Sequence, residues 1–266
     1  KQKSRFYRIQ PIHKSGSSDG DFVLLTGLMP SGEVAPYRIR GFPYDHSLPK
    51  HAAKAGYRTE FLHGNDGAFF NRREALSQMG FDRLLFREEL VADFHCPQSG
   101  WGVDDSKVFE ISYELLAKCD EPTIHFLITL TTHGPFHYVD PSKWELFTTP
   151  ANISEHYLNS MRFMDRQLQN YVESLPPGTT VVLYGDHTPK VDFGQPPSPK
   201  RVEYVPFLIY NVGEDLSVSQ KTTGGLAESG ELTMLDCVTY LWRQIQEPVG
   251  NPDKEPVAEP AALGST

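Results

Sequence analysis

The stretch Val-Val-Leu-Tyr-Gly-Asp-His-Thr-Pro at residues 181–189 places a β-branched apolar run directly before a glycine, an acid and an imidazole. The run predicts a buried parallel strand of an α/β protein. Ligands of such sheets bind beyond the carboxyl ends of the strands, where Asp186 and His187 would emerge. A carboxylate and an imidazole together suit Zn²⁺ or Mn²⁺. The alternative is a structural turn in which Asp186 caps a helix, and the dipeptide alone does not separate the two.

Length and composition indicate a globular protein with no nucleic-acid partner. The chain has 266 residues, of which 39% are hydrophobic and 22% charged, enough for one large α/β domain or two small ones. Its net charge of −9 argues against binding through nucleic-acid phosphates. The sequence contains no run of about 20 apolar residues, so no membrane span is predicted. Cys96, Cys119 and Cys237 match no zinc spacing and allow at most one disulfide, so they do not identify the compartment.

Apolar periodicity predicts alternating strands and helices within one domain at residues 1–246. We expect strands at residues 5–12, 57–62, 122–130, 181–184 and 205–210. We expect helices at residues 22–28, 47–56, 69–79, 106–117, 153–175 and 232–245, with Tyr157, Met161, Met164, Leu168 and Tyr171 forming the core stripe of the longest. Residues 195–199 form a predicted loop that could act as a lid. The Pro-, Glu- and Ala-rich residues 247–266 are expected to be a flexible tail.

Small and hydroxyl residues lie between the first strand and the first helix. Residues 13–21 read His-Lys-Ser-Gly-Ser-Ser-Asp-Gly-Asp. Free N–H groups and the helix dipole at such a junction favour an anion, and a hydroxyl there could be a nucleophile. The structural alternative is that Ser17, Ser18 and Asp19 only cap the helix.

Three predicted strands each end with a histidine, namely His63, His133 and His187. Any one of them could be a buried structural histidine. Because the carboxyl ends of parallel strands meet at one edge of a sheet, three together favour a functional site.

These motifs, taken in order, resemble the lipoteichoic acid synthase and phosphoglycerol transferase branch of the alkaline phosphatase–sulfatase superfamily. The resemblance extends from about Phe6 to Leu241. Its segments are residues 17–22 (Ser-Ser-Asp-Gly-Asp-Phe), 63–65 (His-Gly-Asn), 69–72 (Phe-Phe-Asn-Arg), 132–136 (Thr-His-Gly-Pro-Phe) and 184–187 (Tyr-Gly-Asp-His). It implies an alkaline phosphatase-like three-layer α/β/α sandwich with a mostly parallel central sheet.

The resemblance assigns a nucleophile and a metal site. Ser17 stands where the family has its threonine nucleophile, with Ser15 and Ser18 as alternatives. Asp186 and His187 match the metal-binding pair, and Ser17 would complete the ligands that this chain contributes. No histidine for a second metal follows closely, so we expect one divalent ion, Mn²⁺ first and Mg²⁺ or Zn²⁺ as alternatives.

The resemblance also assigns the residues that bind the head group. His63, Arg72 and His133 match positions that hold the phosphoryl group, and His133 could also be the general acid. Phe70 stands where the family often has tryptophan, and Asn65 where some members have an acid. The alternative for Arg72 is a solvated helix residue.

The implied reaction moves a phosphoglycerol-type head group from a phospholipid donor to a glycan or polyol acceptor. It would pass through a covalent phosphoserine at the periplasmic or extracellular face of a bacterial cytoplasmic membrane. The parent protein is expected to be membrane-anchored through a segment absent here. The family's first strand, which carries a metal-binding carboxylate, is also expected to lie upstream of this sequence.

Four other functions stay open. Two are a phosphoethanolamine transferase and a soluble phosphodiesterase that delivers the group to water. A sulfatase would need a formylglycine in a Cys/Ser-x-Pro-x-Arg setting, which does not surround Ser17. The last is a catalytically inactive module that binds head groups or glycans.

Overall fold

The computed structural model describes residues 5–194, 203–213 and 232–245. The strands are β1 (Arg5–Gln10), β2 (Arg58–His63), β3 (Arg83–Leu85), β4 (Gln98–Ser99), β5 (Gly102–Val103), β6 (Thr123–Ile128), β7 (Thr180–Tyr184), β8 (Val205–Asn211) and β9 (Leu232–Thr233). The helices are α1 (Ser18–Thr26), α2 (Leu48–Lys54), α3 (Arg72–Met79), α4 (Arg87–Ala92), α5 (Asp105–Ala117), α6 (Ile153–Ser174) and α7 (Met234–Ile245). Three short 3₁₀ segments are η1 (Pro36–Arg38), η2 (Phe69–Asn71) and η3 (Pro141–Lys143).

The strands form two larger sheets and one hairpin. One sheet has the order β3-β2-β6 and is wholly parallel. The other has the order β7-β8-β1-β9, in which β1 and β9 are parallel while β8 runs antiparallel to β1 and β7. The short strands β4 and β5 form an antiparallel hairpin.

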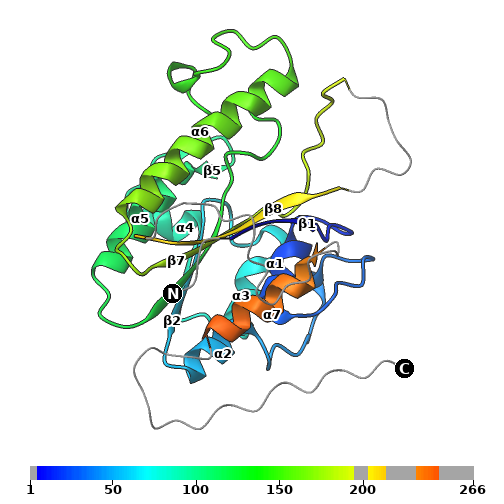
Figure 1. The fold of residues 1–266 in the computed structure, drawn as a ribbon, viewed down its shortest axis with the longest axis vertical. Coiled ribbons are helices and arrows are strands. Elements are labelled where there is room, and N and C mark those ends of the chain that lie inside the picture. Colours follow the sequence, from blue (N-terminus) through cyan, green and yellow to red (C-terminus); the bar gives the residue numbers. More distant parts are fainter. Residues whose placement is uncertain (1–4, 195–202, 214–231, 246–266) are drawn as a thin grey trace.

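Strand β2 lies between two helical layers. Successive side chains of a strand point to opposite faces, and in β2 both faces are covered. Phe61 is fully buried against residues of α1, α2 and α3, whereas its neighbour Leu62 is fully buried against residues of α4 and α5. Figure 1 shows the strands between α4, α5 and α6 on one side and α1, α2, α3 and α7 on the other. The predicted three-layer α/β/α arrangement is therefore present.

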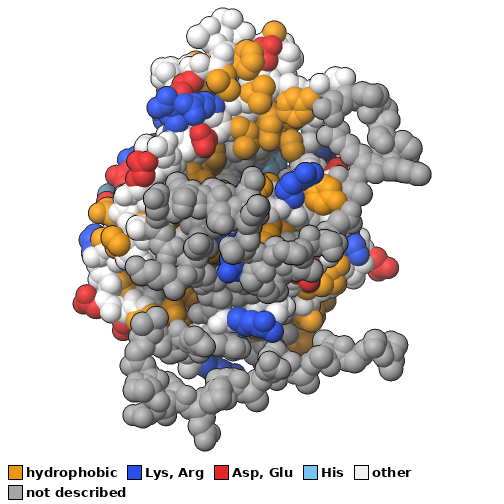
Figure 2. Space-filling view, in the orientation of Figure 1, with side chains coloured by type: hydrophobic (Ala, Val, Ile, Leu, Met, Phe, Trp, Pro, Cys, Tyr) orange, Lys and Arg blue, Asp and Glu red, His pale blue; other side chains and the backbone are white. Residues whose placement is uncertain are grey.

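The long helix α6 agrees with its predicted bounds and with its predicted core stripe except at Met161. Asn152 caps its first turn by accepting a hydrogen bond from the Glu155 N–H at 3.0 Å. Met164 is buried as expected, but Met161 is 40% exposed and Phe163 is buried instead. Tyr157, Leu168 and Tyr171 are half-buried, so the stripe departs from the prediction only in its middle, where the buried face turns towards Ser160 and Phe163. Figure 2 shows hydrophobic side chains gathered over its amino-terminal end.

Two predicted elements differ in detail. Residues 69–79 are not one helix, because Phe70 and Asn71 have positive φ values of 57° and 65° and α3 begins only at Arg72. Strand β7 is half-buried and pairs antiparallel with β8, so the prediction of a buried parallel strand was wrong. Apolar composition indicates a strand but carries no information about the direction of its partner.

Several other predictions can be compared directly. The remaining strands and helices lie where expected to within a few residues, although β6 is half-buried throughout. The three cysteines are free. The predicted loop at residues 195–199 and the tail at residues 247–266 lie outside the described residues. No described helix is both long and apolar enough to cross a bilayer.

Candidate active site

Ser17 and His187 lie together although 170 positions separate them in the sequence. Ser17 occupies the N-cap position of α1, but its hydroxyl makes no capping bond and lies 3.1 Å from His187 Nε2. On its other side, the His187 ring is 2.8 Å from the Thr188 carbonyl through Nδ1. A carbonyl only accepts hydrogen bonds, so Nδ1 carries the hydrogen and Nε2 presents a lone pair to Ser17.

Asp186 adds a carboxylate at the same point. Its Oδ2 lies 3.4 Å from His187 Nε2, and its Oδ1 accepts the His187 N–H at 2.9 Å. Helix α1 approaches closely at Gly20, where an added Cβ would lie 3.5 Å from the Asp186 Cβ. The first turn of α1 and the end of β7 are therefore in van der Waals reach of each other.

Asp19 holds the loop that carries the serines. Its buried carboxylate accepts the N–H groups of Lys14 and Ser15 at 2.6 and 2.7 Å, and the Ser15 hydroxyl at 2.5 Å. The Ser18 hydroxyl is buried and has no partner among the described residues. Of the three candidate serines, Ser17 is thus the one whose hydroxyl reaches His187.

His63 ends β2 and is 3% exposed. Its Nδ1 donates to the Ile128 carbonyl at 2.8 Å, so the lone pair lies on Nε2. Burial, together with the nearby Arg72 charge, lowers the pKa of the ring to about 3. His63 is therefore neutral at physiological pH and can accept a hydrogen bond, but it supplies no positive charge.

Arg72 is 3% exposed, which makes the alternative of a solvated helix residue wrong. Its Nε and Nη2 donate to one oxygen of the buried Asp21, at 3.1 and 3.0 Å. Burial alone would lower the pKa of the guanidinium, but the Asp21 carboxylate outweighs it and the pKa of Arg72 is raised. The charge of Arg72 is thus largely matched within the protein.

Phe70 links this ion pair to the serine loop. Its ring lies 5.3 Å from the Arg72 guanidinium, and an added Cβ on Gly16 would lie 3.0 Å from its edge. The exposed Arg38 stacks over the same ring at 5.5 Å and has no ion pair with any described carboxylate. Arg38 is therefore a cation beside the site that the sequence did not single out.

Asn65 and His133 differ in accessibility. Asn65 is 7% exposed, and its side-chain oxygen accepts the Asp66 N–H at 2.7 Å, which organises the turn after β2. His133 is exposed, and its Nδ1 donates to the Gly134 carbonyl at 2.8 Å, leaving Nε2 accessible. The accessible nitrogen suits a group that exchanges protons with a ligand.

His13 was missed as a site residue. Its ring stacks on that of His187, with centroids 4.2 Å apart and planes 23° apart. Burial and the neighbouring His187 lower its pKa, whereas Asp186 raises it, and the net shift is downward. The available signal was its place just after the first strand, the same kind of position as the other site histidines.

The side chains at this site can supply some, but not all, of the ligands of a divalent cation. Among the residues that the structure describes, no three His, Cys, Asp or Glu side chains converge as a ready metal cage. Ser17, Asp186 and His187 nonetheless bring a hydroxyl, a carboxylate and an imidazole lone pair together. These oxygen and nitrogen donors fit Mn²⁺, Mg²⁺ or Zn²⁺ and leave coordination positions for other ligands.

The sequence and the fold both have known relatives. A lipoteichoic acid synthase of Staphylococcus saprophyticus is 28% identical over 195 residues, covering 68% of this chain and 30% of that protein. The lipoteichoic acid synthase LtaP of Listeria monocytogenes superposes with a TM-score of 0.68 at 22% identity, covering 80% of this chain and 58% of that one. The Streptococcus pyogenes phosphoglycerol transferase GacH, in complex with sn-glycerol-1-phosphate, superposes with a TM-score of 0.62 at 19% identity. This match covers 91% of this chain and 64% of that one.

The superpositions confirm the predicted fold class. The segment that matches the Staphylococcus saprophyticus protein is less than a third of that protein's length. The family model named Sulfatase matches residues 10–224, which include both Ser17 and the Asp186–His187 pair. The chain therefore belongs to the sulfatase family.

Proposed function

We propose that this chain transfers a phosphoglycerol-type head group from a phospholipid to a glycan or polyol hydroxyl. One observation carries the proposal: the Ser17 hydroxyl lies 3.1 Å from His187 Nε2, beside the Asp186 carboxylate. Similarity to a lipoteichoic acid synthase and to the fold of a phosphoglycerol transferase supports this substrate class. Such a reaction would occur at the outer face of the cytoplasmic membrane.

Ser17, Asp186 and His187 would hold the single divalent cation, Mn²⁺ in first place. A bound cation would supply Lewis acidity, which lowers the pKa of a hydroxyl and offsets phosphoryl charge. The Ser17 hydroxyl gives its proton to water, and its oxygen attacks the phosphorus and forms a phosphoserine while the bond to the diacylglycerol oxygen breaks. The acceptor oxygen then attacks the same phosphorus, and the Ser17 oxygen leaves and regains a proton from water.

The remaining side chains would bind and exchange protons. Protonated His133 gives its Nε2 proton to the leaving diacylglycerol oxygen, and the neutral ring takes the proton of the acceptor hydroxyl in the second step. Neutral His63 accepts a hydrogen bond from a head-group hydroxyl. Arg38, exposed and without a described carboxylate partner, suits the phosphoryl oxygens better than Arg72, whose fork already binds Asp21.

The test is release of labelled head group by the full-length protein with Mn²⁺, from phosphatidylglycerol against phosphatidylethanolamine. Ser17→Ala should abolish release and phosphoserine formation. Ser18→Ala is the matched control, because that buried hydroxyl has no described partner. Release that survives Ser17→Ala would refute the nucleophile. Release from phosphatidylethanolamine alone would favour the phosphoethanolamine transferase, and binding of either lipid without any release would favour an inactive module.

A further inference from the structure

A row of aromatic rings leads away from the serine loop. Phe70, which contacts Gly16, lies 4.6 Å from Phe69, and Phe69 lies 6.2 Å from Trp101. The row ends at His133, whose ring lies 4.3 Å from that of Trp101. It therefore connects the proposed nucleophile loop with the proposed proton carrier.

Two of these rings are open to solvent. Phe69 is 41% exposed and Trp101 is 36% exposed. Exposed aromatic surface that is contiguous with a site, and that no described element covers, is typical of ligand contact.

The backbone holds Trp101 in a defined position. It lies in the two-residue turn of the β4–β5 hairpin, after Gly100, whose φ is +58°. Gly102 packs so closely on the Gly64 carbonyl that an added Cβ would lie 1.9 Å from the oxygen. Val103 N donates to the same carbonyl at 2.9 Å, so the hairpin is fastened to the turn after β2.

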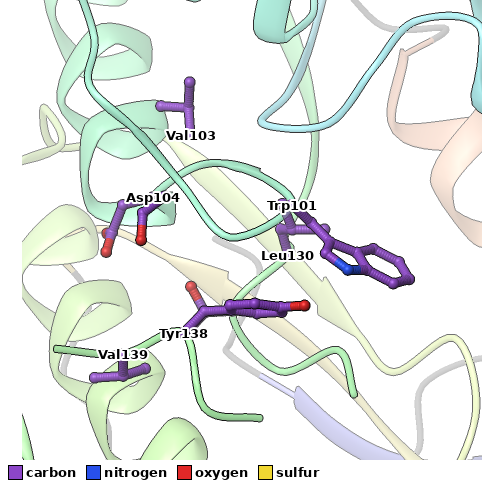
Figure 3. A pocket seen from close by; sticks show the side chains of 8 residues that line it. Trp101, Val103, Asp104, Leu130, Tyr138 and Val139 are labelled. Atoms are coloured by element: carbon purple, nitrogen blue, oxygen red, sulfur yellow. The ribbon is translucent and has the colours of Figure 1, made fainter. Parts of the chain in front are cut away.

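A small cavity of about 20 Å³, room for about one water molecule, lies beside Trp101 (Figure 3). Its lining combines the rings of Trp101 and Tyr138 with the apolar Leu130 and the polar Asp104 and Thr131. Tyr138 lies against the backbone of Gly100, where an added Cβ would be 2.2 Å from the ring. A sugar ring is too large for this cavity, but its apolar face can stack on the exposed face of Trp101 while its hydroxyls meet the polar residues around the cavity. A lipid chain would instead favour an aliphatic wall without the carboxylate of Asp104.

We propose that the exposed face of Trp101, with the polar residues at the edge of this cavity, forms an acceptor subsite that stacks a sugar ring of the acceptor and orients it towards Ser17. This subsite rests on the proposed function, because it defines the acceptor of the same transfer. It would favour a glycan over a small polyol such as glycerol, which has no ring to stack.

The experiment follows labelled phosphatidylglycerol in the full-length protein with methyl glucoside or glycerol as the acceptor. The measured quantity is the ratio of transfer to hydrolysis for each acceptor. Trp101→Ala should lower the ratio for methyl glucoside about tenfold relative to that for glycerol, and Trp101→Phe should restore most of it. Tyr113→Ala removes a similarly exposed aromatic, 38% exposed on α5, and should change neither ratio.

The outcomes separate this subsite from the proposed function. Absence of head-group release by the unaltered protein would count against the function itself. Normal release with an unchanged methyl glucoside ratio in Trp101→Ala would overturn the subsite. Equal falls in the transfer-to-hydrolysis ratio for both acceptors would also overturn it. So would weaker binding to phosphatidylglycerol vesicles with an unchanged ratio, because that result would indicate that the aromatic row contacts lipid.

Discussion

The buried Asp21–Arg72 pair should be worth several kcal/mol to the fold. Both side chains are 4% exposed, and two donors of the guanidinium meet one carboxylate oxygen at 3.0–3.1 Å. Asp21→Asn keeps the shape of the side chain but leaves the guanidinium charge buried without its counter-ion. Removing one partner of a buried ion pair costs about 3–5 kcal/mol. For a chain of this size that corresponds to a fall in Tm of roughly 6–20 °C.

The assay is a double-mutant cycle in urea with Asp21→Asn, Arg72→Met and the double variant. Each single variant should lose about 3–5 kcal/mol of unfolding free energy. The double variant should lose at least about 2 kcal/mol less than the sum, because it buries no unpaired charge. Glu110→Gln in the exposed Lys107–Glu110 pair is the control and should change little.

Two results would refute this reasoning. Single variants that lose less than about 1 kcal/mol would show that water or another group solvates the remaining charge. Losses that add to within about 0.5 kcal/mol would show that the two side chains act independently. In either case Arg72 would again be available to bind the phosphoryl group directly.

Three further predictions concern pH, metal affinity and the hairpin. Burial raises the pKa of Asp105 to about 6 from 3.8, so the folded state holds this proton more tightly and stability falls as pH rises from about 4 to about 6. Urea unfolding should show a loss of about 3 kcal/mol in unfolding free energy across that range. Asp105→Asn should remove this dependence of stability on pH. His13→Ala should weaken Mn²⁺ binding about tenfold by calorimetry, whereas His13→Phe, which keeps a ring against His187, should retain most of the affinity; equal losses would rule out stacking as the cause. Gly102→Ala must displace the Gly64 carbonyl and should cost about 1–3 kcal/mol in thermal unfolding, and an unchanged Tm would mean that the hairpin yields freely.

Local signals in the sequence identified most of the helices and strands. The Asp104 and Asn152 caps mark helices that begin as predicted, because capping depends on residues a few positions apart. The common edge of parallel strands accounts for His63 and His133, which follow the paired parallel strands β2 and β6. It does not account for Asp186 and His187, because β7 lies in the other sheet and pairs antiparallel with β8.

Tertiary structure decided which side chains meet at the candidate active site. Nothing local distinguishes Ser17 from its neighbours Ser15 and Ser18, and the difference arises because His187 reaches only Ser17 from 170 positions away. The burial of Arg72 likewise depends on Asp21 on another helix. Backbone preferences are set by adjacent residues, whereas hydrogen-bond partners, charge burial and strand direction are set by packing between distant segments.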